Sequence, residues 1–195
     1  EGINPIVSPD TTTVFYCPIR QDSVAWESSD TFNPAATIYD GKVVVLYRAE
    51  DNSAVGIGSR TSRLGYAYSD DGLHFNRMTV PVFYPADDNQ KELEWPGGCE
   101  DPRVAVTDDG LYVMLYTQWN RKQARLAVAT SRDLQIWEKY GPAFAKAYGG
   151  RFFDEFSKSA SIVTKLVDGK QVIAKIDGKY WMRSEERRVG KECPY

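Results

Sequence analysis

The segment KELEWPGGCEDPR (residues 91–103) gathers side chains that could do acid–base chemistry. Its Pro-Gly-Gly sequence predicts a tight turn that lets the backbone approach a ligand closely. A carboxylate next to a proline at the start of a strand is held rigidly, which a general acid requires. The alternative is a salt-bridged surface turn, because a neighbouring arginine lowers the pKa that an acid needs to keep high. The side chains concerned are Glu94, Glu100, Asp101 and Arg103.

Basic residues near the ends of apolar runs could bind an anion. A guanidinium fork and an ammonium point charge both suit phosphate. Taken singly, such residues are more often surface ion pairs. Aromatic residues close to them could stack on sugar rings or belong to the core. The basic residues are Arg48, Arg60, Arg63, Arg121 and Lys158, and the aromatic ones are Tyr47, Trp95, Tyr116 and Trp119.

An internal repeat relates these candidates to one another. One unit reads FNPAATIYDGKVVVLYRAED (32–51) and then SRLGYAYSDDGLHF (62–75). The next reads EDPRVAVTDDGLYVMLYTQWN (100–120) and then ARLAVATSRDLQIW (124–137), so that Asn33 aligns with Asp101. A third unit begins near residue 157 and places Lys158 at the same position. Strands whose first residues face a core would not carry Asn, Asp and Lys there, so we expect the three side chains to line a pocket.

The elements that must position these residues are short strands. Apolar runs of strand length, rich in Val, Ile, Leu and Tyr, alternate with Asp-Gly pairs that favour tight hairpin turns. Two hairpins per unit make four strands, which is the unit of a β-propeller blade. The alternative, a two-sheet sandwich, has no reason to repeat at this period. The runs are 42–47, 65–68, 111–117, 126–130, 161–164 and 171–176, and the Asp-Gly pairs are 40–41, 71–72, 109–110, 168–169 and 177–178.

The sequence therefore predicts an all-β chain with about three propeller blades. Closed propellers have about four to eight blades, so we expect residues 1–182 to form a partial catalytic propeller and the natural protein to be longer. Residues 183–195 (RSEERRVGKECPY) lack the β pattern and resemble vector read-through, and we predict a non-native tail there. A genuine solvated tail is the alternative.

Composition excludes several function classes. The 195 residues carry a net charge of -3, too balanced for a nucleic-acid or polybasic membrane-surface binder, and no apolar run approaches the about 20 residues that span a bilayer. Three widely spaced cysteines predict neither a zinc site nor a disulfide framework, and the single histidine excludes a multi-histidine metal site. The aromatic content of 13% favours β-structure and sugar-binding clefts. A signal peptide cannot be read from a sequence that begins at Glu1.

Several strings resemble glycoside hydrolase family 130, the β-mannoside phosphorylases and related β-mannosidases. They are FNPAA, LYRAED, TSRLG, WPGGCEDPR, the YT..WNR pattern and SKSA, in the family's order between about residues 4 and 182. The resemblance implies a five-bladed β-propeller. It also implies inverting phosphorolysis, in which phosphate cleaves a β-mannoside and releases α-mannose 1-phosphate.

The resemblance also implies roles for individual residues. Asp101 would be the general acid and would pass its proton through a hydroxyl of the mannose. No metal or organic cofactor is implied, and inorganic phosphate is a cosubstrate. The mannose site would comprise Asn33, Arg48, Asp51 and Arg103, and the phosphate site Arg63, Asn120, Arg121 and Lys158.

Reaction chemistry favours phosphate as the nucleophile. An inverting glycosidase needs two carboxylates, one as acid and one as base. Phosphate needs no base, and cations can hold it in place. One prominent aspartate with several basic residues is therefore the arrangement expected of a phosphorylase, and the resemblance implies β-mannoside oligosaccharides as its substrates. A cytoplasmic location is favoured because the sugar phosphate is kept only inside a cell. We expect no nucleic-acid or membrane partner, and a homo-oligomer is left open. The alternatives are an inverting β-mannosidase, which would be periplasmic or secreted, and a non-catalytic mannoside-binding propeller.

Overall fold

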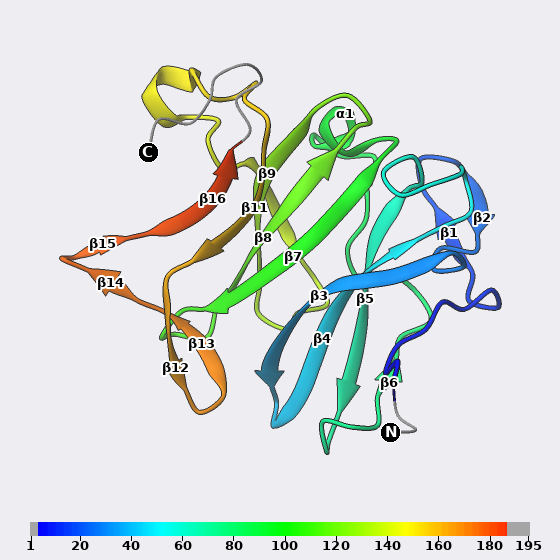
Figure 1. The fold of residues 1–195 in the computed structure, drawn as a ribbon, viewed down its shortest axis with the longest axis horizontal. Coiled ribbons are helices and arrows are strands. Elements are labelled where there is room, and N and C mark those ends of the chain that lie inside the picture. Colours follow the sequence, from blue (N-terminus) through cyan, green and yellow to red (C-terminus); the bar gives the residue numbers. More distant parts are fainter. Residues whose placement is uncertain (1–3, 187–195) are drawn as a thin grey trace.

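The computed structural model describes residues 4–186 and is almost entirely β (Figure 1). Two four-stranded antiparallel units follow each other along the chain. The first contains β3 (Asp30–Tyr39), β4 (Lys42–Glu50), β5 (Ser62–Ser69) and β6 (Asn76–Arg77). The second contains β7 (Gly98–Val106), β8 (Tyr112–Trp119), β9 (Ala124–Ser131) and β10 (Glu138–Pro142). The four-stranded repeat predicted from the sequence is confirmed for these two units.

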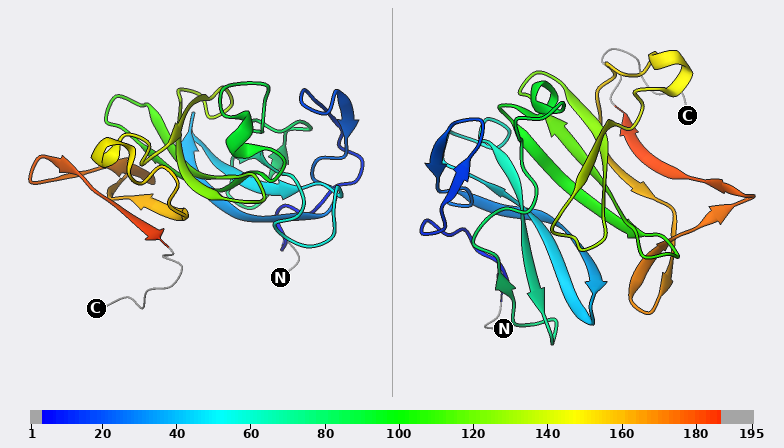
Figure 2. Two further views of the ribbon diagram at one scale, coloured as in Figure 1. Left: turned by 90° about the horizontal axis from the view of Figure 1, so that it is seen from above. Right: turned by 180° about the vertical axis from the view of Figure 1, so that it is seen from behind.

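The third unit is built differently. β11 (Ser157–Ile162) pairs with β16 (Met182–Glu186), the last described strand, so the predicted tail begins as part of a strand. The rest of that tail, 187–195, lies outside the described residues. Two hairpins separate the paired strands: β12 (Thr164–Val167) with β13 (Lys170–Ile173), and β14 (Lys175–Ile176) with β15 (Lys179–Tyr180). Figure 2 shows the three units side by side in chain order.

Short elements complete the described chain. The hairpin β1 (Phe15–Cys17) and β2 (Asp22–Val24) packs beside the first unit, and the helix α1 (Lys91–Glu94) precedes β7. A 3₁₀ turn spans Ala147–Gly150. No helix within residues 4–186 is long and apolar enough to cross a membrane.

Tight turns follow the predicted Asp-Gly pairs. Asp40 and Gly41 connect β3 to β4 with φ of 49° and 73°, which is the left-handed backbone that two-residue hairpins require. The Asp-Gly pairs at 168–169 and 177–178 have the same signs and close the two hairpins of the third unit. The Asp-Gly pattern therefore located these turns correctly.

Apolar side chains between the first two units form the main core. Leu46 and Leu64 of the first unit pack with Met114 and Tyr116 of the second, and all four are at most 1% exposed. A second cluster buries Trp26 and Tyr47 beneath the N-terminal hairpin. Cys17 and Cys99 are free and buried, and Cys193 lies outside the described residues.

The first strand of each unit contains a bulge at the same place. The pairing register shifts between Phe32 and Ala35, between Glu100 and Arg103, and between Lys158 and Ser161. Each bulge holds one left-handed residue with φ near 50°: Asn33, Asp101 and Ser159. The structural counterpart of Asn33 and Asp101 is therefore Ser159. Lys158, which the sequence alignment placed there, instead matches Phe32 and Glu100.

Candidate active site

The side chain of Arg48 on β4 is the centre of a buried polar cluster. Its Nη1 donates to Asp101 Oδ1 at 3.0 Å, and its Nη2 donates to Glu50 at 2.6 Å and to Glu100 at 2.8 Å. Its Nε donates to the Ser62 hydroxyl at 3.0 Å. The centroid of the Phe32 ring lies 4.5 Å from the guanidinium carbon, and Arg48 is 3% exposed.

Asp101 is held by three positively polarised groups. Asn33 Nδ2 donates to its Oδ1 at 2.9 Å, Arg48 donates to the same oxygen, and Lys158 Nζ lies 3.5 Å from Oδ2. Burial by itself raises the pKa of Asp101. The hydrogen bond from Asn33 and the charges of Arg48 and Lys158 outweigh burial and hold that pKa below its usual range. Asp101 is therefore an ionised, rigidly placed carboxylate in the absence of a ligand.

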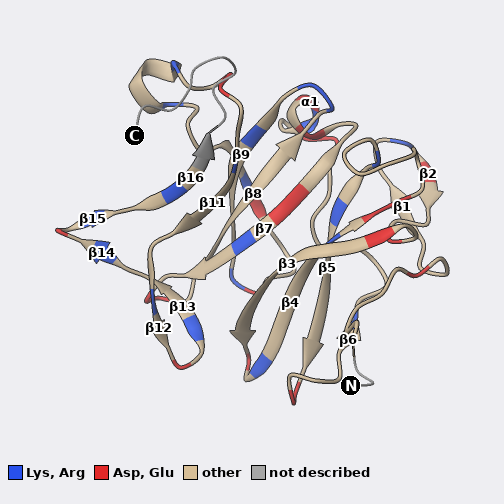
Figure 3. Ribbon diagram, in the orientation of Figure 1, with Lys and Arg blue, Asp and Glu red and all other residues tan. Residues whose placement is uncertain are grey.

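Two more carboxylates share the cluster. Glu50 is completely buried, and its Oε1 also accepts from the Ser62 hydroxyl at 3.2 Å. Its Oε2 has no hydrogen-bond partner and lies 3.7 Å from Arg60, which pairs with Asp30. Burial raises the pKa of Glu100, against the opposing charge of Arg48. Figure 3 shows the acidic residues of β7 in the middle of that strand.

Lys158 connects the cluster to a pocket of about 200 Å³. Its ammonium lies 3.7 Å from Glu100 Oε2 and 3.5 Å from Asp101 Oδ2, and its side chain is 33% exposed. Arg48, Glu100 and Lys158 form the polar wall of the pocket, and Trp119 and Phe156 contribute aromatic surface. Aromatic rings beside polar groups suit a sugar, and the cluster next to it can move a proton.

Comparison with known proteins identifies the family. A family model described as beta-1,4-mannooligosaccharide phosphorylase, that of glycoside hydrolase family 130, matches residues 3–191. The chain belongs to family 130.

Curated relatives in family 130 are phosphorylases. The 1,2-beta-oligomannan phosphorylase of Thermoanaerobacter sp. (strain X514) is 36% identical over 152 residues, which cover 76% of this chain and 46% of the relative. The beta-1,2-mannobiose phosphorylase of the same strain is 32% identical over 168 residues, which cover 80% of this chain and 49% of the relative. The chain therefore spans about half the length of the curated relatives it matches.

Solved structures agree in fold. A Bacteroides thetaiotaomicron VPI-5482 protein described as a candidate glycosidase is 97% identical, with a TM-score of 0.93 over 95% of this chain and 53% of that one. Another structure is 70% identical, with a TM-score of 0.91 over 93% of this chain and 51% of that one. Its description says that the GH130 family of mannoside phosphorylases contains glycoside hydrolases that target β-1,2 mannosidic linkages in Candida mannan.

Four of the residues that the family 130 resemblance implied come together. Asn33, Arg48 and Asp101 are hydrogen-bonded to one another through Asp101, and Lys158 approaches the same carboxylate. They come from β3, β4, β7 and β11, which is why their sequence separation is large. The expected convergence of Asn33, Asp101 and Lys158 is thus observed, with Lys158 one residue before the matched position. Of the three, Lys158 alone is a lining residue of the pocket of about 200 Å³ in the described part of the chain.

Arg63 and Asp51 form a separate buried pair. Arg63 Nη1 lies 2.8 Å from Asp51 Oδ2, and both side chains are 1% exposed. Side chains alternate between the two faces of a strand, and Arg63 pairs opposite Ala49 rather than Arg48. It therefore packs against Phe15 and Cys17 of the N-terminal hairpin. The structure does not bring Arg63 to Lys158, nor Asp51 to Asp101.

The remaining predicted residues lie outside the cluster. Arg103 is exposed, and its guanidinium donates to the carbonyl of Pro102, so Arg48 takes the place of the arginine expected beside Asp101. Asn120 donates to the carbonyl of Glu92 and accepts backbone N–H groups of the turn after β8. Arg121 follows in that turn, exposed and with φ of 65°.

Sequence reasoning assigned no role to two residues of the cluster, Glu50 and Ser62. Glu50 lies two residues after Arg48 on the same strand, and Ser62 pairs opposite Glu50 on β5. Residues two apart on a strand share a face, so the alternation in YRAED contained the signal for Glu50. Nothing in the sequence marks the hydroxyl of Ser62.

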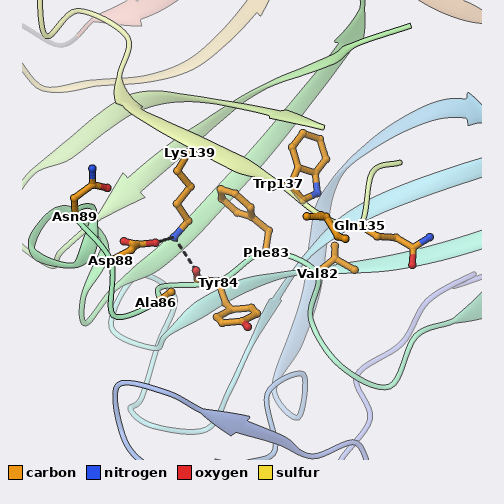
Figure 4. A pocket seen from close by; sticks show the side chains of 10 residues that line it. Val82, Phe83, Tyr84, Ala86, Asp88, Asn89, Gln135, Trp137 and Lys139 are labelled. Carbon is orange, nitrogen blue, oxygen red and sulfur yellow. Dashed lines mark hydrogen bonds and ion pairs between the residues drawn. The ribbon is translucent and has the colours of Figure 1, made fainter. Parts of the chain in front are cut away.

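A second pocket, of about 430 Å³, lies between the loop 82–89 and β10 (Figure 4). Lys139 points into it, and its ammonium contacts the carbonyl of Tyr84 at 2.9 Å, Asp88 at 3.2 Å and Glu94 at 2.5 Å. Its charge is balanced by two carboxylates. Lys139 is also less accessible to a phosphate than Lys158, since its side chain is 11% exposed against 33% for Lys158.

Proposed function

We propose that this chain is part of an inverting enzyme that cleaves β-mannosides, with Asp101 delivering the proton to the leaving group. The observation that supports this role is the placement of Asp101 on a left-handed bulge, held by Asn33, Arg48 and Lys158. When a sugar hydroxyl binds Asn33 or Lys158 in place of Asp101, the Asp101 carboxylate loses a group that stabilises its charge. Its pKa then rises, and it can be protonated for transfer.

Phosphate is the proposed nucleophile. The two curated relatives are named phosphorylases of β-1,2-linked mannosides, so α-mannose 1-phosphate is the expected product and a β-1,2 linkage the expected substrate. Lys158, partly exposed at the pocket, is the cation that we assign to phosphate in this half of the enzyme. The proposed reaction needs no metal or organic cofactor. Its product, a sugar phosphate, is useful only if it stays inside the cell, which favours a cytoplasmic location.

The three units are proposed to be successive blades of a five-bladed propeller. Their first strands carry the same bulge, and β3 and β7 lie side by side, as do β7 and β11. A longer protein would close the ring with the remaining blades and complete the pocket. For the experiments below, residues 1–182 are joined to the part of the 97% identical Bacteroides relative that this chain does not cover. We call this longer chain the extended protein.

Hydrolysis is a second candidate, and two observations favour it. In the cluster, two cations, Arg48 and Lys158, face three carboxylates, an excess of negative charge that opposes a phosphate dianion. The 70% identical structure is described in connection with family hydrolases. In that case water would replace phosphate, a carboxylate would serve as base, and a periplasmic or secreted location would be favoured.

Product analysis distinguishes these functions. The extended protein is incubated with β-1,2-mannobiose, with and without inorganic phosphate. Phosphate-dependent release of α-mannose 1-phosphate supports phosphorolysis, whereas free mannose alone, independent of phosphate, supports hydrolysis. Binding of the sugar without release of either product would indicate a non-catalytic propeller and overturn both.

A further inference from the structure

Glu100 and Asp101 are consecutive residues whose carboxylates contact the same guanidinium. In a regular strand their side chains would point to opposite faces. The bulge at Asp101 removes that alternation, so Glu100 Oε1 accepts from Nη2 of Arg48 and Asp101 Oδ1 from Nη1. One oxygen of each carboxylate is thereby fixed on Arg48.

The second oxygens of both carboxylates face the same ammonium. Lys158 Nζ lies 3.7 Å from Glu100 Oε2 and 3.5 Å from Asp101 Oδ2. An ammonium carries three protons on a flexible stem. After a small movement it can give a proton to one carboxylate, and the resulting amine can accept the proton of the other carboxyl group.

Glu100 also has a route to water. Together with Lys158 it lines the pocket of about 200 Å³, and its side chain is 6% exposed against 8% for that of Asp101. A proton lost with the leaving group can therefore be replaced from solvent at Glu100.

We propose that Glu100 is a positioning residue that stores the proton of the site and supplies it to Asp101 through Lys158. The inference rests on the proposed function, because it takes Asp101 as the acid. In the transfer, protonated Glu100 gives its proton to Lys158 while the ammonium gives one to Asp101. Glu100 becomes a carboxylate, Asp101 a carboxylic acid, and Lys158 remains an ammonium. The summed charge of the three groups is the same before and after.

The charges around Glu100 and Asp101 support a proton transfer from Glu100 to Asp101. Glu100 is faced by Arg48 and Glu50 from β4, by Asp101 on its own strand and by Lys158 from β11. Burial, with the charges of Asp101 and Glu50, raises the pKa of Glu100, whereas the net effect at Asp101 is a lowered pKa. In the free protein Glu100 therefore holds a proton more readily than Asp101 does. A mannoside that draws Asn33 away raises the pKa of Asp101 and favours transfer of the proton there through Lys158.

The test is the pH profile of kcat/KM in the extended protein with unactivated β-1,2-mannobiose. Glu100→Gln keeps the shape and the contact to Arg48 but cannot store a proton, so Asp101 must be protonated from solvent at its own lowered pKa. We expect a loss of about tenfold or more near pH 7 that is recovered as the pH falls by one to two units, since each pKa unit is a factor of ten. An aryl β-mannoside with an activated leaving group should show little loss at either pH.

Two further variants make the result specific. Glu50→Gln removes a carboxylate on the same Arg48 nitrogen and one of the charges that raise the pKa of Glu100, but it leaves the relay in place, so it should move the profile less than Glu100→Gln does. Lys158→Gln removes the relay together with a charge that lowers the pKa of Asp101, so its pH profile has no single expected direction. Its kcat/KM should instead fall more on mannobiose than on the aryl mannoside, which provides a second test if the Glu100 variant does not fold. A pH-independent loss or no loss in Glu100→Gln, or an equal loss on both substrates in Lys158→Gln, overturns the inference. Product formation by the unmodified extended protein tests the proposed function separately.

Discussion

Asn33 Nδ2 donates a hydrogen bond of 2.9 Å to Asp101 Oδ1, although the two residues are 68 positions apart. They occupy the same left-handed position in consecutive repeats. The repeat thus brings its own equivalent residues into contact. In this pair one copy carries the carboxylate and the other the amide that stabilises its charge.

Asp101→Asn in the extended protein should lower kcat on an unactivated β-mannoside by about 10²-fold or more, because the amide has no proton to transfer. The loss should be smaller on an aryl mannoside whose leaving group needs little protonation. Steady-state kinetics on both substrates measure the difference. Full activity of Asp101→Asn on mannobiose would show that the acid lies elsewhere.

Lys158→Ala should raise the KM for phosphate by roughly 10- to 150-fold, since a lost charge-assisted contact is worth about 1.5–3 kcal/mol. Phosphate saturation at fixed mannobiose concentration provides the measurement. Arg63→Ala is the comparison, because Arg63 is paired with Asp51 away from the pocket and its loss should reduce stability instead. If Arg63→Ala raised the KM for phosphate and Lys158→Ala did not, Arg63 would belong to the phosphate site.

Arg48→Met should destabilise the extended protein by about 3–5 kcal/mol, because it leaves buried carboxylates without their cation. Chemical denaturation followed by tryptophan fluorescence gives this value. Arg132→Met is the matched control, since Arg132 pairs with Asp109 on the surface and should have little effect. Equal effects of the two variants would contradict the central role of Arg48.

Asp51→Asn should destabilise the extended protein at neutral pH and progressively less in acid. Burial raises the pKa of Asp51, but Arg63 and the hydrogen bonds from Ser53 outweigh burial and hold the pKa below its usual value. Such a group stabilises the fold above its unfolded pKa of about 3.9, and that contribution is lost as the pH falls through the folded pKa. Denaturation midpoints of both proteins at pH 7 and below pH 4 measure the effect. A difference that grows in acid would refute the assigned sign.

Residues 1–195 expressed alone should show no turnover of β-mannosides with or without phosphate. The third unit lacks the four-stranded form of the first two, and exposed apolar residues such as Tyr180 and Trp181 line a groove beside it. Activity assays on the isolated chain and on the extended protein make the comparison. Turnover of about 1 per second by the isolated chain would contradict the proposal of a longer enzyme.

Sequence patterns predicted the strands and hairpin turns of the first two units well, because apolar runs and Asp-Gly pairs are local in the sequence. Alternating apolar runs located β4, β5, β8 and β9, and the Asp-Gly pairs located the hairpin turns. The third unit was harder to predict, because β11 pairs with β16 across two hairpins and not with its neighbour in sequence. Nothing local in the sequence of 157–182 specifies that long-range pairing.

The site was predicted only in part, for a physical reason. Asp101, Asn33 and Arg48 carry side chains whose chemistry and repeat position both point to a pocket. Arg63 has the same chemistry, but it lies on the other face of β5 and is neutralised by Asp51. Residue type alone does not reveal which face a strand presents to the pocket, so Arg63 was included and Glu50 was not.

The left-handed bulge of β3, β7 and β11 has a consequence for how such a protein can diversify. The backbone, and not a rotamer, sets the direction of the residue at this place, since φ near 50° recurs for Asn33, Asp101 and Ser159. A substitution at one of these three positions therefore exchanges a chemical group while the path of the chain stays the same. Residues branched at Cβ are unsuited to these positions, because φ > 0 is strained for them. The side chains compatible with this backbone are thus a few small polar ones, and a change of chemistry at the site requires an exchange among them.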